Sequence, residues 1–117
     1  MYKMQTPQAV SLAGVCSMRI YNHPDPQDFI LQRIFTALSD PVRLDIVRHL
    51  SRVTKATCGE LDGGRPKSSM SHHFRILREA GLVQIDVAGT VHQNTLRRAE
   101  LDSRFPGLMG AILKQTS

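Results

Sequence analysis

The feature that most constrains the fold is a change in the spacing of apolar residues at Gly81. Between residues 68 and 80, apolar side chains recur every three or four positions, which is typical of a helix with one buried face. Between residues 83 and 87 they alternate with polar side chains, which is typical of a half-buried strand. Residues 88–90 form a turn in this pattern, so residues 91–97 can pair back as a second strand. We therefore predict a helix that Gly81 ends, followed directly by a β-hairpin.

Two helices are predicted before this point. Asp25-Pro26 and Asp40-Pro41 each place a capping residue before a proline at the first helical position. Apolar residues at helical spacing follow both signals. The pattern predicts one helix over residues 26–38 and another over residues 41–51.

A capping box opens a shorter third helix. Thr57 and Glu60 have the required spacing, and they predict a helix over residues 57–63 that the following Gly-Gly-Arg-Pro run ends. A fourth helix then opens at Lys67 or Ser68. After the hairpin, residues 100–114 are again helical in pattern, although Pro106 opens a new helical segment within them.

This order of elements predicts a mainly α-helical winged helix-turn-helix with a small β-hairpin. A chain of 117 residues suits one domain. Two prolines, at positions 24 and 26, separate a weakly periodic N-terminal arm from the rest. We expect an arm over residues 1–24 and a single domain over residues 25–117.

The positive charge is concentrated in the middle of the chain. The formal net charge is +5, and residues 41–98 hold ten Lys or Arg against five Asp or Glu, whereas both flanks are neutral. A basic centre of this kind favours a polyanionic partner. The chain has four Phe, two Tyr and no Trp, so it lacks the ring platforms on which single-stranded nucleic acids stack.

The polar face of the fourth helix suits double-stranded DNA. In a helix-turn-helix, the second helix reads base edges in the major groove, and phosphate contacts fix its register. Hydroxyls near a helix start suit phosphates, and Arg suits guanine. The predicted contacts are Arg65, Lys67, Ser68, Ser69, Ser71, His72, His73, Arg75, Arg78, Arg97 and Arg98. His73 lies between the polar and apolar faces, and Arg97 and Arg98 have Glu100 and Asp102 as alternative partners.

Two segments resemble the arsenic-repressor (ArsR) family of bacterial winged-helix regulators. Residues 35–44, FTALSDPVRL, resemble the opening signature of the family, and residues 70–83, MSHHFRILREAGLV, resemble its recognition helix and the start of its wing. The similarity covers residues 28–115. It implies a homodimer on a palindromic operator, usually repressing transcription until an inducer weakens DNA binding. The sequence does not identify the operator or the inducer.

The resemblance also implies that the dimer is built from the first and last helices. A small domain cannot bury wide apolar faces on both helices by itself, so these faces suit a partner subunit. The residues expected at the dimer interface are Ile30, Ile34, Leu108, Ile112 and Leu113.

Sensor sites of the family are not reproduced. Many members bind metal through a cysteine pair on the third helix or through His and acidic residues on the last helix. Here Cys58 stands alone in its region and the last helix has no His, so we expect no metal and no cofactor. Cys16 and Cys58 leave a reversible thiol switch open, with a half-buried Cys58 and an incidental Cys16 as the simpler interpretation.

An enzyme is not expected. Capping explains the Asp residues at helix starts, and the neighbours Ser71 and His72 lack the third group of a catalytic triad. Without an apolar segment long enough for a signal core or a membrane span, we expect a cytoplasmic protein. Two alternatives remain: a thiol- or metal-responsive version of the same regulator, and a winged-helix protein-interaction module that binds no DNA.

Overall fold

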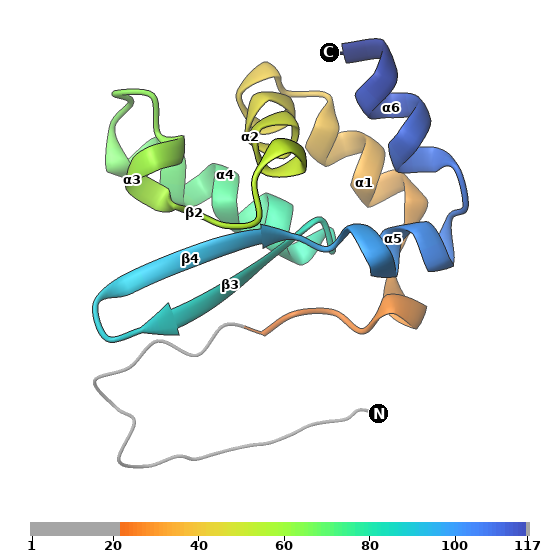
Figure 1. Ribbon diagram of the computed structural model, residues 1–117, viewed down its shortest axis with the longest axis horizontal. Coiled ribbons are helices and arrows are strands. Elements are labelled where there is room, and N and C mark those ends of the chain that lie inside the picture. Colours follow the sequence, from red (N-terminus) through yellow and green to blue (C-terminus); the bar gives the residue numbers. More distant parts are fainter. Residues whose placement is uncertain (1–21, 117) are drawn as a thin grey trace.

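The computed structural model describes residues 22–116 of the chain. The elements in order are the 3-10 helix η3 (Pro26–Asp28), α1 (Leu31–Leu38), α2 (Pro41–Arg52), β2 (Ala56–Thr57), α3 (Cys58–Leu61), α4 (Lys67–Glu79), β3 (Val83–Ala88), β4 (Val91–Leu96), α5 (Arg98–Arg104) and α6 (Leu108–Thr116). Figure 1 shows α1 to α4 on one side of the β3–β4 hairpin, with α5 and α6 at the end away from the hairpin tip. The predicted order of helices and hairpin is confirmed.

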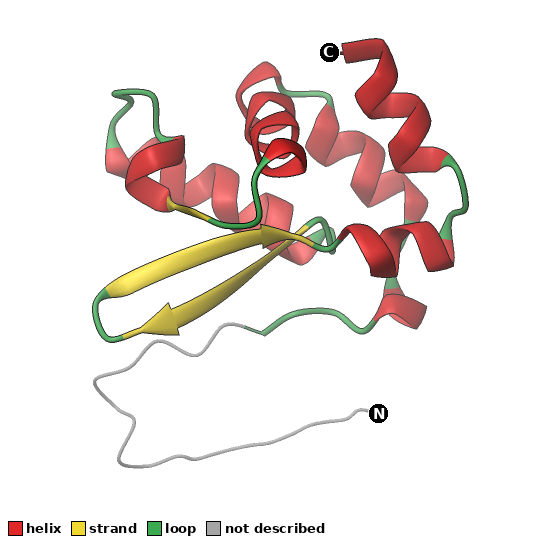
Figure 2. Ribbon diagram, in the orientation of Figure 1, coloured by secondary structure: helices red, strands yellow, loops and turns green. Residues whose placement is uncertain are grey.

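The sheet has three antiparallel strands in the order β2-β4-β3. Residue pairs Ile85–Asn94 and Ala88–Val91 set the register of the hairpin, and Gly89 turns between them with a φ of 65°. The predicted hairpin is therefore confirmed. Strand β2 pairs Ala56 with Asn94 on the other side of β4 (Figure 2). Strand β2 was not predicted, because two residues are too short to show an alternating pattern.

The core is continuous from α1 to α6. The predicted apolar stripe of α4 is buried: Met70 is 3% exposed, Phe74 5% and Leu77 0%. Burying a side chain of this size contributes roughly 1.5–3 kcal/mol, so the stripe fixes which face of α4 points inward. The opposite face, with its serines and Arg75, is consequently turned toward solvent.

Two predicted helix starts are confirmed. The Asp40 carboxylate accepts hydrogen bonds from the backbone N–H groups of Val42 (2.8 Å) and Arg43 (3.3 Å). Partial burial opposes ionisation, but these bonds hold the pKa of Asp40 below its ordinary value. At α3, Thr57 and Glu60 exchange both bonds of a capping box, and the backbone bond from Thr57 lowers the pKa of Glu60.

Gly81 ends α4 as predicted. Its φ is +89°, and the bonds Gly81 N–H to Arg78 O and Leu82 N–H to Leu77 O complete a Schellman motif. A Cβ at this position would overlap with the ring of Phe29. Glycine is therefore required twice, for the left-handed backbone and for the close approach of Phe29.

The single helix predicted over residues 26–38 is wrong. The chain forms η3, then runs extended through Phe29 and Ile30 before α1 begins. Asp25 makes no side-chain cap. Phe29 is 3% exposed and packs into the core, so tertiary packing of this ring interrupts a segment that local signals would make continuous.

Candidate nucleic-acid interface

The polar face of α4 is exposed along its first half. Lys67, Ser68, Ser69, Ser71, His72 and Arg75 are all exposed. One Arg75 N–H donates to Nδ1 of His72 at 3.4 Å, because an arginine can only donate. This contact brings together two of the side chains that the sequence predicts to contact DNA.

The N-terminus of α4 suits an anion. Its N-cap residue is Pro66, and no side chain caps the first turn. The hydroxyl of Ser69 donates to Pro66 O at 3.0 Å rather than covering the backbone N–H groups. Unsatisfied N–H groups and the positive end of the helix dipole favour a phosphate here, with Lys67 beside it.

A groove of about 990 Å³ lies between α3, α4 and the hairpin. Six predicted contacts line it: Lys67, Ser68, Ser71, His72, Arg75 and Arg78. Across from them stand Thr90, Val91 and His92 of the hairpin, with Cys58 and Asp62 at α3. Three Lys or Arg side chains face a single carboxylate there, so the groove favours a polyanion.

The hairpin side of this groove was not found from the sequence. The tip looked neutral, and no charge pattern marked Thr90 or Val91. The second strand was predicted to begin at Val91, as it does. A strand pattern does not show which element the hairpin lies against, so its position across from α4 could not be predicted.

Arg65 and Arg78 lie at the edges of this surface. Arg65 is exposed, and its guanidinium donates to Asp62 O at 3.3 Å, within the turn that precedes α4. Arg78 is half-buried and lines the groove. Both side chains could therefore reach a phosphate from these positions, and the two phosphate contacts stay predictions.

His73 points to a neighbouring helix rather than into the groove. It is half-buried, and its Nδ1 lies 3.2 Å from Nη1 of Arg43 on α2. It is absent from the lining of the groove that takes His72 and Arg75. The predicted DNA contact therefore does not fit His73, because its ring nitrogen is used inside the domain.

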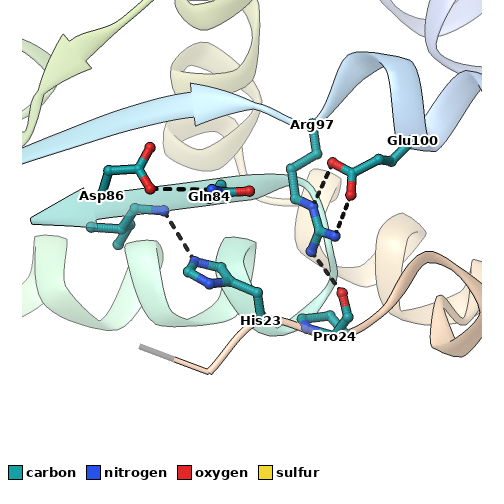
Figure 3. Close-up of polar contacts among 7 residues, drawn as sticks. His23, Pro24, Gln84, Asp86, Arg97 and Glu100 are labelled. Carbon is teal, nitrogen blue, oxygen red and sulfur yellow. Dashed lines mark hydrogen bonds and ion pairs between the residues drawn. The ribbon is translucent and has the colours of Figure 1, made fainter. Parts of the chain in front are cut away.

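Arg97 does not fit a phosphate contact either. Its side chain is 6% exposed and makes two bonds to the Glu100 carboxylate, at 3.0 and 2.7 Å (Figure 3). It also donates to Pro24 O at 2.8 Å and lies over the ring of Phe29. The hydrogen bond from Arg97 lowers the pKa of Glu100. Arg97 is thus a structural residue that ties residues 24–29 to the start of α5.

Arg98 keeps an exposed position but has a partner. Its Nε lies 3.0 Å from the Asp102 carboxylate, and both side chains are 44% exposed. An exposed pair of this kind is weak, so Arg98 remains able to exchange Asp102 for a phosphate.

The apolar residues expected at a dimer interface differ in how far they are buried. Ile34 is 0% exposed and belongs to the core of its own domain, so its prediction is wrong. Helix α1 packs against α2 and α4. Ile30 remains 46% exposed, and Phe35, which the prediction omitted, is 51% exposed. On α6, Leu108, Ile112 and Leu113 are half-buried against the core.

Of the two cysteines in the predicted thiol switch, one lies within the described residues. Cys16 lies outside the described residues. Cys58 is half-buried at the start of α3, where its Sγ accepts a hydrogen bond from Asn94 Nδ2 at 3.3 Å. The switch therefore stays a prediction.

Residues 22–116 contain neither a metal-binding cluster nor a membrane-spanning helix. No group of three His, Cys, Asp or Glu side chains in this part of the chain is placed to hold a metal ion. No helix in the same region is long and apolar enough to cross a membrane.

Comparison with known proteins agrees with this geometry. A model of the helix-turn-helix domain family matches residues 38–85. The uncharacterized HTH-type transcriptional regulator YceK of Bacillus subtilis (strain 168) is 36% identical over 88 residues, which span 73% of this chain and 88% of the relative. The match therefore covers most of both proteins.

Solved structures give the same result. A crystal structure of an ArsR family transcriptional regulator has a TM-score of 0.59 and 26% identity, and covers 74% of this chain and 97% of that protein. The transcriptional repressor BigR from Xylella fastidiosa has a TM-score of 0.59 and 25% identity, over 74% of this chain and 86% of its own. With an exposed polar α4 beside a basic groove, the chain therefore belongs to the ArsR family of winged helix-turn-helix transcriptional regulators, which are DNA-binding proteins and not enzymes.

Proposed function

We propose that this chain is a cytoplasmic repressor that binds an inverted repeat in double-stranded DNA as a homodimer. The observation that carries the proposal is the groove between α4 and the hairpin, where six predicted contact residues and the hairpin tip share one surface. Residues 67–75 would enter the major groove, and Arg65, Arg78 and Arg98 would hold phosphates at its borders.

The apolar surface at the other end of the domain supports the dimer. Ile30 is exposed just before α1, Phe35 is exposed within it, and α6 keeps a half-buried apolar face. Figure 1 shows α1 and α6 at the end of the molecule away from α3 and the hairpin tip. A dimer through this end would leave both copies of α4 accessible, as an inverted repeat requires.

Repression is supported by similarity alone. BigR, which shares the fold at 25% identity, is described as a transcriptional repressor. A homodimer bound across a promoter would act in the same direction by excluding polymerase.

The test is a binding titration with the full chain. Duplexes that the protein selects from a random pool would be measured by fluorescence anisotropy between about 50 and 200 mM salt, where counterion release predicts a steep fall in affinity. Sedimentation would give the mass of the free and bound protein. A protein-interaction module would select no duplex, and a monomer at the concentrations that bind DNA would exclude the proposed dimer.

A further inference from the structure

We propose that Arg43 and His73 form a positioning contact that sets the rotation of α4 about its own axis, and so the aim of the DNA-reading face. The inference rests on the proposed function for its DNA readout. It assigns His73 the role of a positioning residue, which touches another side chain rather than DNA.

Arg43 is held firmly by α1. It is 8% exposed, although it carries a permanent charge. Its Nε donates to Ala37 O at 2.7 Å and its Nη2 donates to Thr36 O at 3.4 Å. Both carbonyls belong to the last turn of α1, where the helix dipole is negative. Thr36 O also accepts the backbone N–H and the hydroxyl of Ser39, at 3.2 and 2.6 Å, so the shorter bond to Ala37 O is the main anchor of the guanidinium, and the helix end offsets its charge.

The remaining arm of the guanidinium points to α4. Nη1 lies 3.2 Å from Nδ1 of His73. Since arginine has no acceptor, Nδ1 must accept, and His73 must be the neutral tautomer that carries its proton on Nε2. The guanidinium is planar and its donors have fixed directions. Two bonds to α1 thus determine where the third donor points, and His73 must lie there.

The contact with His73 gives α4 a directional restraint on its rotation, which the apolar core of the helix does not give. Met70, Phe74 and Leu77 form one apolar stripe, and such a stripe tolerates a small roll because dispersion contacts have no direction. His73 is next to this stripe and next to His72, which lines the groove. A directed hydrogen bond on this flank stops the roll that would move His72 and Arg75.

The contact also links the proposed DNA-reading face on α4 to the proposed dimer surface on α1. Arg43 belongs to α2, its carbonyl partners belong to α1, and His73 belongs to α4. Helix α1 also carries the exposed Phe35 of the proposed dimer surface. The orientation of α4 relative to α1 sets the separation of the two reading helices in a dimer, so the contact bears on half-site spacing.

The test compares two replacements of His73. In His73→Asn, the amide oxygen occupies the place of Nδ1 and keeps an acceptor for Arg43, whereas His73→Leu removes it. Arg43→Met removes the donor, and His49→Leu is the matched control, because His49 is an exposed histidine on α2. Each full-length variant would be titrated with a duplex selected by the wild type and with an unrelated duplex, and its thermal unfolding would be recorded.

We expect His73→Leu to weaken binding to the selected duplex about tenfold or more, since sites tolerate errors of only about 0.5 Å, and to change binding to the unrelated duplex less than about twofold. His73→Asn and His49→Leu should stay near the wild type. The double variant Arg43→Met/His73→Leu should lose no more than Arg43→Met alone, because both substitutions break one contact. Losses that add, or a His73→Asn variant as weak as His73→Leu, would overturn the proposal.

A second measurement does not depend on DNA. Nitrogen-15 spectra of the free protein should show His73 protonated on Nε2 only, and amide shifts of residues 67–79 should move in His73→Leu and Arg43→Met but not in His73→Asn. An Nδ1-protonated His73 would exclude the contact. A wild type that selects no duplex, with these spectra as expected, would refute the proposed function and leave the contact itself standing.

Discussion

Two groups of basic residues border the hairpin, and the structure uses them in opposite ways. On α4, Lys67 and Arg75 are exposed, and among the described residues neither has an ion pair. At the exit of β4, Arg97 and Arg98 are paired with Glu100 and Asp102. The sequence predicted DNA contacts for both groups, with Glu100 and Asp102 as alternative partners of Arg97 and Arg98.

Spacing alone does not separate the two groups. Arg97 has Glu100 three residues on, but Arg75 also has a carboxylate four residues on, at Glu79. Arg75 nevertheless lies against His72, whereas Arg97 is buried under the segment from Pro24 to Phe29. Burial forces a charge to take internal partners, and exposure leaves it available. The comparison therefore predicts that Arg97 controls stability, whereas Lys67 and Arg75 control DNA binding.

The largest expected effect is on Arg97. Replacing it in Arg97→Met removes two bonds to Glu100, one to Pro24 O and the cation over Phe29, and should lower the free energy of unfolding by about 2–4 kcal/mol. Glu100 is 39% exposed, so water limits the cost of leaving it unpaired. Urea unfolding would measure the change. The control is Arg98→Met, whose exposed pair should contribute less than about 1 kcal/mol.

Arg75→Ala should show the reverse pattern. We expect a loss of about 1–3 kcal/mol in binding to a selected duplex, together with relaxed base preference at one position. The free energy of unfolding should hardly change, because Arg75 is exposed. Repeating the selection from a random pool with the variant would reveal the preference. An unchanged preference would remove Arg75 from the base-reading set.

Lys67→Ala should have a smaller and less specific effect. Lys67 stands beside the uncapped first turn of α4, where we place a phosphate. Its loss should weaken binding to all duplexes alike and reduce the slope of log affinity against log salt by about 1. Titrations of a selected and an unrelated duplex at several salt concentrations would test this. A loss confined to the selected duplex would contradict the assignment.

The sequence predicted the part of this comparison that depends on local signals. Capping at Asp40 and Thr57, the stop at Gly81 and the apolar stripe of α4 follow from neighbours within a few residues, and all are as predicted. These features place the exposed face of α4 correctly. They are local because caps and helix periodicity involve the backbone of a single turn or helix.

What could not be predicted depends on partners distant in the chain. Arg97 contacts Pro24, His73 contacts Arg43, and Phe29 occupies the space beside Gly81. Each contact joins residues that are 30 or more positions apart, so no local pattern contains it. Ile34 was misplaced for a related reason: a helical stripe shows that one face is buried but not whether its own domain or a partner buries it.

The smallest expected effect is a change of stability with pH. It comes from His23, which lies beside the buried network around Arg97. His23 Nε2 accepts the backbone N–H of Ile85 at 3.1 Å, which requires a neutral ring (Figure 3). Burial lowers the pKa of His23 from its ordinary value of 6.5, and the charges of Arg97 and Arg78 lower it further, while Asp86 and Glu100 oppose them.

Because the folded state binds this proton less readily than the unfolded state, the contribution of His23 to stability is fully present above pH 6.5. It is lost as the pH falls from 6.5 through the lowered pKa of the folded state. His23→Gln keeps an acceptor for Ile85 but does not titrate, so its free energy of unfolding should fall less than that of the wild type over this range. Urea unfolding at a series of pH values would measure the difference. Parallel curves for the two proteins would mean that His23 takes up its proton equally well in both states, and that residues 23–29 are not held against the hairpin as tightly as the Arg97 contacts require.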